Sequence, residues 1–253
     1  MDKETTTVRQ CFNRKGENPM NSTRRRISIL MGLALGCGVM IATPSYAVPY
    51  SWTDWTSANT TSATGTVDGV GVSFTGDLAP AAQTSGGINY WAANSGIYTS
   101  AGVDNGPTPN SDIIRLTGGT GTGLQTLTFS TPVTDPVMAI LSLGQSIASN
   151  GVDVPVQYIF DVPFTILNQG VGFWGGSATG LTQGATTLTG LEGHGIIQFS
   201  GTFNSISWTM PLSENWHGFT VGKATSVPEP TSLMLLGAGL AAIGIWRRKA
   251  AKG

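Results

Sequence analysis

Two histidines and the glutamates beside them are the strongest candidates in this chain for acid–base or metal chemistry. His194 follows Glu192 by two residues, and His217 follows Glu214 by three. Each pair could share a proton or a metal ion. A zinc site or a catalytic site also needs a third positioned group, and the spacing supplies none. We therefore interpret both histidines as turn or core residues, and we predict no cofactor.

A second candidate site is the loop between Asp104 and Asp112. Its two aspartates bracket Pro107 and Pro109, and carboxylate oxygens are the ligands that calcium prefers. The same residues also form Asx turns around prolines, which is the commoner structure. Asp104 and Asp112 are thus a weak calcium candidate, and no other metal site is predicted.

Other catalytic patterns do not emerge from the sequence. There is no Gly-x-Ser-x-Gly motif, and the glycine-rich run 118–123 lacks the lysine of a phosphate-binding loop. Hydrolysis of a glycan needs two acids facing across a cleft. The spacing of Asp153, Asp161, Glu192 and Glu214 selects no such pair. We expect a protein that is not an enzyme, and a glycan-active enzyme is the least favoured alternative.

Tryptophan offers a different chemistry, because an exposed indole can stack on a sugar ring. Trp208 alternates with Ile206 and Met210, which predicts a core position. Four others lie among Gly, Ser and Asn and are predicted to be exposed, with possible carbohydrate contact: Trp52, Trp55, Trp91 and Trp174. A carbohydrate-binding, lectin-like module is accordingly the main alternative function.

Short β-strands are the elements that must position these residues. Gly and Thr are abundant, and apolar residues alternate with polar ones in several runs, while Val137–Leu143 is continuously apolar. Prolines and glycines separate the runs. The predicted strands are Val70–Phe74, Ile113–Leu116, Gln125–Phe129, Val137–Leu143, Val156–Phe160, Phe164–Leu167, Ile196–Phe199, Ile206–Met210 and Phe219–Val221. They predict an all-β domain, a β-sandwich or jelly roll, over residues 48–222, followed by a linker at 223–226.

Charge and cysteine content narrow the function further. Residues 48–226 contain ten acidic side chains against two basic ones, Arg115 and Lys223, a net charge of −8. A domain this acidic has no electrostatic basis for binding nucleic acid or anionic lipid. The two cysteines, Cys11 and Cys37, lie in the segment that we expect to be removed, so the mature chain has no thiol.

The N-terminal region is typical of a secretory signal peptide. Residues 20–47 contain the basic run Arg24–Arg26, the apolar run Ile27–Ile41 and small residues before Ala47, where we predict cleavage. Residues 1–19 are interpreted as an extension upstream of the true start. Arg24-Arg25 also resembles a twin-arginine signal, and Cys37 a lipoprotein site, but both patterns fit less well.

The C-terminal region, 227–253, combines three features in a fixed order. Val227-Pro228-Glu229-Pro230 comes first, an apolar run predicts a transmembrane helix at 232–246, and Arg247-Arg248-Lys249 follows. About 16 uncharged residues span roughly 24 Å as a helix, short for a bilayer core of about 30 Å. The basic cluster predicts a cytoplasmic C-terminus and an ectodomain on the other side.

This tail resembles the PEP-CTERM sorting signal of Gram-negative bacteria that make extracellular polysaccharide. The resemblance covers about a tenth of the chain. It implies a substrate of exosortase, a membrane transpeptidase-like enzyme that is thought to cut near the Pro-Glu-Pro. Signal peptidase and the export translocon would be the other processing partners, and exopolysaccharide a possible one. We thus expect a non-enzymatic protein that passes through an inner-membrane-anchored stage with a periplasmic ectodomain to the cell surface or the extracellular matrix.

Overall fold

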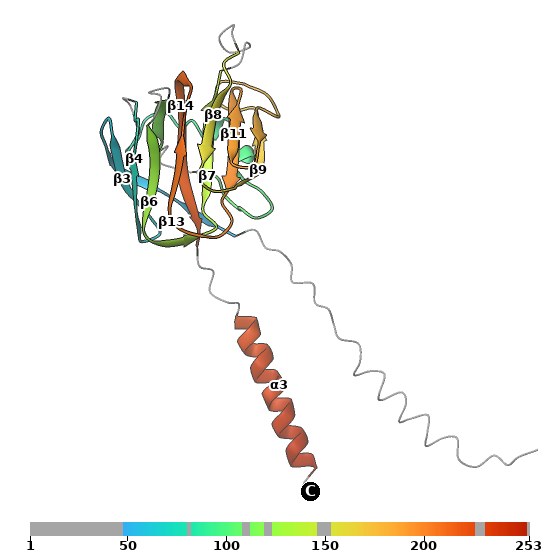
Figure 1. The fold of residues 1–253 in the computed structure, drawn as a ribbon. Coiled ribbons are helices and arrows are strands. Elements are labelled where there is room, and N and C mark those ends of the chain that lie inside the picture. Colours follow the sequence, from blue (N-terminus) through green and yellow to red (C-terminus); the bar gives the residue numbers. More distant parts are fainter. Residues whose placement is uncertain are drawn as a thin grey trace, which may run out of the picture. The chain divides into compact units, whose positions relative to one another are not determined.

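The computed structural model describes residues 48–79, 82–107, 112–118, 123–145, 153–225 and 231–251 (Figure 1). The predicted extension, 1–19, and the predicted signal peptide, 20–47 with its cleavage position Ala47, lie outside the described residues. The segment 226–230, which includes Val227, Pro228, Glu229 and Pro230, also lies outside them.

The described residues form fourteen strands in two antiparallel sheets. Sheet one has the order β1 (Tyr50–Trp52), β14 (Ser213–Ala224), β7 (Val137–Leu143), β12 (Gly193–Gln198) and β9 (Thr165–Gly170), and β5 (Ile114–Gly118) also pairs with β14. Sheet two has the order β10 (Leu181–Gln183), β11 (Thr187–Gly190), β8 (Val156–Phe160), β13 (Thr202–Thr209), β6 (Leu124–Thr134), β4 (Val70–Thr75), β3 (Ser62–Val67) and β2 (Asp54–Ala58).

Aromatic side chains from both sheets meet in the core between them. Phe219 of β14 lies 5.2 Å from Phe74 of β4 and 5.4 Å from Trp208 of β13, measured between ring centroids. All three side chains are buried. The prediction of an all-β sandwich is confirmed at the level of two packed antiparallel sheets, and so is the prediction that Trp208 is a core residue.

The continuous apolar run of β7 is explained by its position, because both faces of this strand are covered. Met138 and Ile140 belong to the core between the sheets. Ala139 and Leu141 pack on the other face, in a second cluster under the 3₁₀ segment η1 (Ala92–Tyr98). A strand buried on both sides reads as a continuous hydrophobic run, and every residue of β7 is buried.

Five strands were missed by the sequence analysis: β1, β2, β3, β10 and β11. They consist mostly of small and hydroxyl-bearing residues, such as Ser62-Ala63-Thr64-Gly65-Thr66 in β3, and carry few apolar side chains. Tertiary pairing holds them in the sheets although their apolar alternation is too short or too weak to predict a strand. A further difference concerns β14, which continues to Ala224, so Lys223 and Ala224 belong to this strand and not to the predicted linker.

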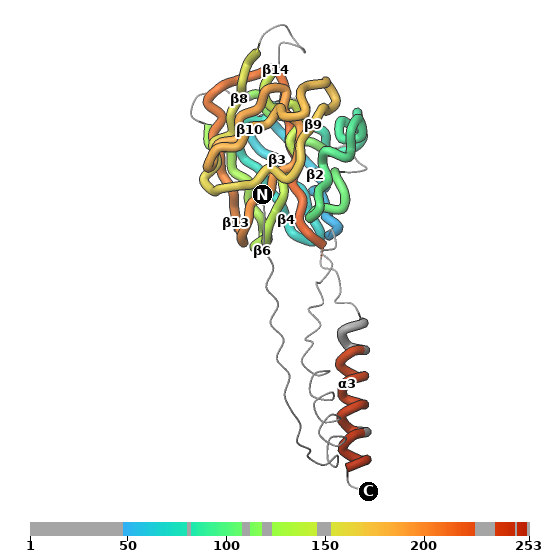
Figure 2. The backbone as a smooth tube through the Cα atoms, turned by 90° about the vertical axis from the view of Figure 1, so that its right-hand side faces the viewer, coloured from blue at the N-terminus to red at the C-terminus, as the bar shows by residue number. Residues whose placement is uncertain are grey.

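The C-terminal helix α3 (Thr231–Ala250) is drawn in red in Figure 2. It is longer than the predicted 232–246 segment, because it includes Arg247, Arg248 and Lys249 in its last turn. Among the described residues, no helix is both long enough and apolar enough to cross a membrane. The prediction of a helix here is confirmed, and the prediction that it spans a membrane is not supported.

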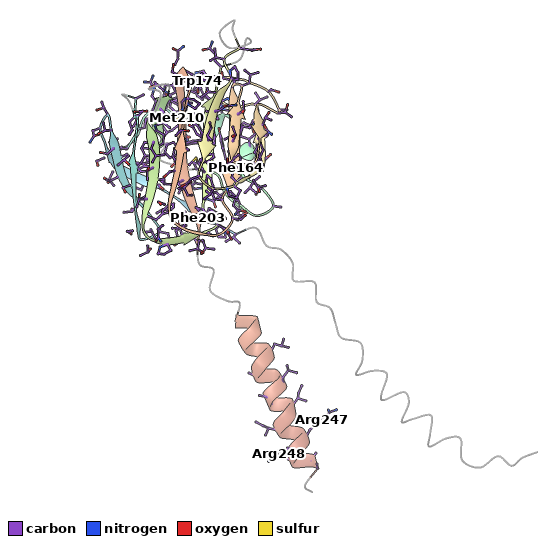
Figure 3. The ribbon with its side chains drawn as sticks, in the orientation of Figure 1. Phe164, Trp174, Phe203, Met210, Arg247 and Arg248 are labelled. Carbon is purple, nitrogen blue, oxygen red and sulfur yellow. The ribbon has the colours of Figure 1, made fainter. Side chains whose placement is uncertain are left out.

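The strand register defines two opposite ends of the sandwich. At one end, which we call the exit end, Tyr50 of β1 pairs with Ala224 of β14 and Gln198 of β12 pairs with Val137 of β7. At the far end, Leu143 pairs with Gly193. Figure 3 shows Trp174 and Met210 at the far end and Phe203 at the exit end.

Candidate functional site

The far end carries a tight turn with two exposed aromatic side chains. The amide of Gly172 donates to the carbonyl of Gly175 at 2.9 Å, and the amide of Gly175 donates back at 3.2 Å. Phe173 and Trp174 form the tip between them and are 38% and 41% exposed. Figure 3 labels Trp174. Turn tips usually hold Gly, Asn, Asp or Ser, so two large aromatic residues are unusual at this position and make the tip a candidate functional site.

The tip joins two half-buried rings to form what we call the aromatic cap: Tyr90, Phe173, Trp174 and Trp216. Tyr90 lies 5.0 Å from Phe173, 5.2 Å from Trp174 and 5.0 Å from Trp216, measured between ring centroids. Trp174 and Trp216 are 4.5 Å apart. These spacings lie in the range of attractive aromatic pairs.

A cation lies beside the aromatic cap. The guanidinium carbon of Arg115 is 5.9 Å from the ring centroid of Trp216, within cation–π distance. Its Nη2 donates to the carbonyl of Asn215 at 3.2 Å. Burial lowers the pKa of Arg115 from its ordinary value, and the guanidinium stays charged at neutral pH.

Of the four tryptophans predicted to be exposed, only Trp174 is. The prediction is wrong for Trp55 and Trp91, which are 0% and 1% exposed. Trp55 packs against Phe219, and its indole donates to Thr220 Oγ1 at 3.2 Å. Trp52 is half-buried, and its indole donates to the carbonyl of Asn105. The prediction was based on the Gly, Ser and Asn residues next to these tryptophans in sequence. Such neighbours do not determine whether the indole ring itself packs into the core.

The sequence analysis did not include Trp216 among the candidate carbohydrate-contact residues. Nothing in its neighbouring sequence, where it stands beside His217 in a run of strand residues, distinguishes it as a surface residue. Its position in the cap depends on the pairing of β14 with β5, which brings Arg115 opposite Gly218.

Directly beneath the far end lies a buried cluster of Ser142, Glu192 and His194. The Ser142 hydroxyl donates to a carboxylate oxygen of Glu192, and the Ser142 amide donates to Nδ1 of His194 at 3.1 Å. The Nε2 of His194 lies 3.5 Å from the same oxygen of Glu192. A serine nucleophile needs its hydroxyl on the imidazole, whereas this hydroxyl is directed to the carboxylate.

A second buried pair lies nearby on β14. The Nδ1 of His217 is 2.6 Å from Oε1 of Glu214, and the same oxygen accepts the amide of Gly144 at 2.9 Å. The other imidazole nitrogen is 3.4 Å from the sulfur of Met210. Both histidines are fully buried, so of the turn and core positions that the sequence allowed, both occupy core positions.

The weak calcium candidates do not converge. Asp104 is exposed, and its amide donates to the carbonyl of Val48. The Asp112 carboxylate is buried and accepts the Trp55 amide at 2.9 Å, and burial raises its pKa to about 6. Among the described residues, no group of three or more His, Cys, Asp or Glu side chains is placed to hold a metal ion.

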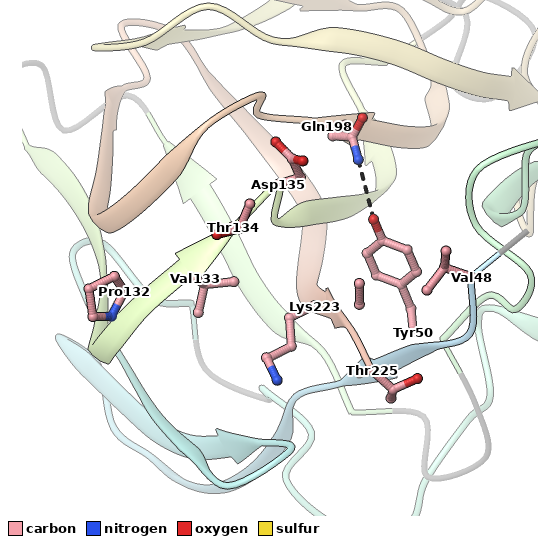
Figure 4. A pocket seen from close by; sticks show the side chains of 10 residues that line it. Val48, Tyr50, Pro132, Val133, Thr134, Asp135, Gln198, Lys223 and Thr225 are labelled. Carbon is pink, nitrogen blue, oxygen red and sulfur yellow. Dashed lines mark hydrogen bonds between the residues drawn. The ribbon is translucent and has the colours of Figure 1, made fainter. Parts of the chain in front are cut away.

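A pocket of about 470 Å³ lies at the exit end (Figure 4). Its wall includes Val48 and Tyr50 near the start of the domain and Lys223 and Thr225 at its end. The Tyr50 hydroxyl accepts a hydrogen bond from the side-chain amide of Gln198 at 3.2 Å. The pocket marks the place where the two ends of the domain come together.

Comparison with known proteins identifies the segment that follows Thr225. Residues 226–249 match the family model of a protein-sorting motif, over the same segment that the sequence analysis singled out. These residues are a PEP-CTERM protein-sorting motif. The motif implies exosortase as the processing partner, and it implies export with a membrane-anchored sorting intermediate. No curated protein and no solved structure matches the chain.

Proposed function

We propose that this protein is a non-enzymatic component of the cell surface or extracellular matrix of a Gram-negative bacterium, delivered there by exosortase. The observation that carries the proposal is the PEP-CTERM motif at 226–249, placed directly after a β-domain whose last strand ends at Ala224. In this scheme a signal peptide at 20–47 starts export through the translocon, and signal peptidase cuts after Ala47. The ectodomain is periplasmic while the tail holds it at the inner membrane.

The two buried histidine–glutamate pairs support a non-enzymatic role. Their imidazole rings are fully buried beneath the far end of the sandwich, and the Ser142 hydroxyl is directed to Glu192 instead of His194. A substrate would have to enter the packed core to reach them. The absence of cysteine from residues 48–253 also rules out thiol chemistry in the proposed mature form.

Intact-mass spectrometry of the protein from membrane, periplasmic and extracellular fractions tests the proposal. Export and processing predict a mature N-terminus at Val48 and a C-terminus near residue 227–230. The double variant Pro228→Ala/Pro230→Ala should accumulate in the membrane fraction with its tail intact. Its matched control is Asp153→Ala/Pro155→Ala, which changes two exposed residues of the ectodomain and should be processed normally. A full-length chain recovered from the cytosol would contradict the proposal.

A second candidate function is carbohydrate binding, with exopolysaccharide around the cell as the ligand. One observation favours it: Trp174 is exposed at the tip of a turn and packs with three other aromatic residues. This candidate is compatible with the first, since a surface protein can be retained by the glycan it contacts.

A further inference from the structure

The aromatic cap is an apolar surface that the fold places in solvent. Phe173 and Trp174 are each about two-fifths exposed, and Val171 beside them is 47% exposed. Burying a large apolar side chain stabilises a fold, so leaving such residues in water forgoes that stabilisation. Four clustered aromatic rings, two of them exposed, offer a surface on which a small ligand ring can stack.

The tip is held in a fixed position by the domain beneath it. Gly172 lies so close to His194 that a Cβ atom built on it would be 2.2 Å from the imidazole Cγ. A Cβ on Gly176 would be 2.3 Å from the carbonyl oxygen of Glu192. The side-chain amide of Asn94 also donates to the carbonyl of Val171 at 3.0 Å. A surface fixed before binding loses little conformational entropy when a ligand arrives.

The cap is too small to serve as an interface between two copies of the chain. A stable protein interface buries about 800 Å² on each partner. A whole aromatic side chain buries roughly 150–250 Å², and the two exposed rings of the cap are less than half exposed. The tip is followed by Gly175, Gly176 and Ser177, which add little apolar area. The exposed aromatic surface suits one or two ligand rings.

The negative net charge of the domain disfavours anionic ligands. Residues 48–226 carry ten acidic and two basic side chains, so polyanions and anionic lipid are repelled. A neutral pyranose ring presents a face of C–H bonds, whose partial positive charge is attracted to the negative face of an indole. Its hydroxyl groups can accept hydrogen bonds from a nearby guanidinium, and Arg115 lies beside Trp216.

We propose that the aromatic cap, made of Tyr90, Phe173, Trp174 and Trp216, binds the pyranose rings of a neutral polysaccharide. Trp174 supplies the main stacking face, Phe173 extends it, and Arg115 donates hydrogen bonds at its edge. The cap lies at the far end of the sandwich, opposite the exit end where Thr225 leads into the sorting motif. It therefore faces away from the attachment point of the tail. This proposal rests on the carbohydrate-binding candidate stated above and names its site and its class of ligand, while the proposed export enters only as the reason why the protein would meet such a polymer.

Fluorescence titration of the purified full-length chain tests this site. The probes are cellohexaose, mannohexaose and chitohexaose, with polygalacturonate as the anionic comparison. We expect at least one neutral hexasaccharide to change the tryptophan emission at saturable concentrations. Trp174→Ala should weaken that binding tenfold or more, and Phe173→Ala should weaken it several-fold. The matched control is Ile159→Ala, because Ile159 has the same 38% exposure as Phe173 but lies on β8 of sheet two.

Several outcomes would overturn the proposal. They are no response to any neutral hexasaccharide, equal binding by Trp174→Ala and the wild type, or tighter binding of polygalacturonate than of the neutral probes. Sedimentation would overturn it in favour of a second copy if the wild type self-associated and Trp174→Ala did not. Circular dichroism of each variant checks that it is folded. The titration does not depend on processing, so a failure of exosortase cleavage in the mass measurement would leave this result standing.

Discussion

Thr225 and Pro49 are hydrogen bonded although 176 residues separate them in the chain. Both the amide and the hydroxyl of Thr225 donate to the Pro49 carbonyl, each at 2.9 Å. The predicted signal-peptide cleavage, after Ala47, falls directly before Val48, and the sorting motif begins at the residue after Thr225. The fold thus brings Pro49 and Thr225, which lie close in sequence to the two predicted processing positions, to the same end of the domain.

A disulfide can test this closure, because residues 48–253 contain no cysteine of their own. Tyr50 and Ala224 are opposite each other in the antiparallel pair, and the Tyr50 backbone amide and carbonyl bond to the side chain of Asn105. They are therefore a non-hydrogen-bonded pair, in which the Cα atoms lie about 4.5 Å apart, within disulfide range. We expect Tyr50→Cys/Ala224→Cys to lose both free thiols when oxidised.

Thiol titration and non-reducing mass spectrometry measure that result. The control pair is Ser51→Cys/Ala224→Cys, whose side chains point to opposite faces of the sheet and should remain reduced. Free thiols in the first pair under oxidising conditions would contradict the β1–β14 register.

Trp55 and Trp174 should respond very differently to the same truncation. Trp55 is fully buried against Phe219, so Trp55→Ala should lower the free energy of unfolding by about 3–5 kcal/mol. Trp174→Ala removes a partly exposed ring and should cost about 1 kcal/mol or less. Urea unfolding followed by circular dichroism measures both values. Equal losses would mean that Trp174 is a core residue and would weaken its assignment to a binding surface.

Gly172 should tolerate no side chain, because of its contact with His194. In Gly172→Ala the new Cβ would meet the imidazole at 2.2 Å, so either the turn or the histidine must move. Overpacking of this kind generally costs about 1–3 kcal/mol. Gly102→Ala is the control, since no atom lies within 4 Å of its Cβ position. Thermal unfolding should separate the two variants, and the emission of Trp174 should change only in the first.

Asp112 should make the domain less stable as the pH rises. Burial raises the pKa of Asp112 from 3.8 to about 6, so the folded chain binds its proton more tightly than the unfolded chain does. Between about pH 4 and pH 6, the free energy of unfolding therefore falls with rising pH. Above about pH 6 the domain keeps the whole loss of stability that comes from ionising the buried carboxyl group. Asp112→Asn keeps an oxygen for the Trp55 amide and removes the charge.

The expected result is that Asp112→Asn unfolds at a higher temperature than the wild type at pH 7, with little difference at pH 4. Differential scanning calorimetry at both values measures this. Asp104→Asn, which changes an exposed aspartate, should behave like the wild type at both. A variant less stable than the wild type at pH 7 would show that the ionised carboxylate is preferred in the fold.

The sequence by itself determined the features that depend on local order along the chain. The sorting motif is a linear stretch of sequence, so it could be identified without a structure from Pro228, Glu229, Pro230 and the basic cluster. The family match to residues 226–249 agrees with that identification. The strands with strong apolar periodicity were also predicted, and β7 was predicted with its observed bounds, because a strand covered on both faces must be apolar throughout.

Tertiary structure alone decided which side chains meet and which reach solvent. Trp55, Trp91 and Trp174 have similar small and polar neighbours in sequence, yet the first two are buried and the third is exposed. The difference in burial arises from long-range strand pairing and from the segment around η1 that packs on sheet one. Neither can be predicted from the residues next to each tryptophan in sequence. The aromatic cap likewise joins Tyr90, Phe173 and Trp216 from distant parts of the chain, because burial and contact are properties of the packed sheets and not of any single segment.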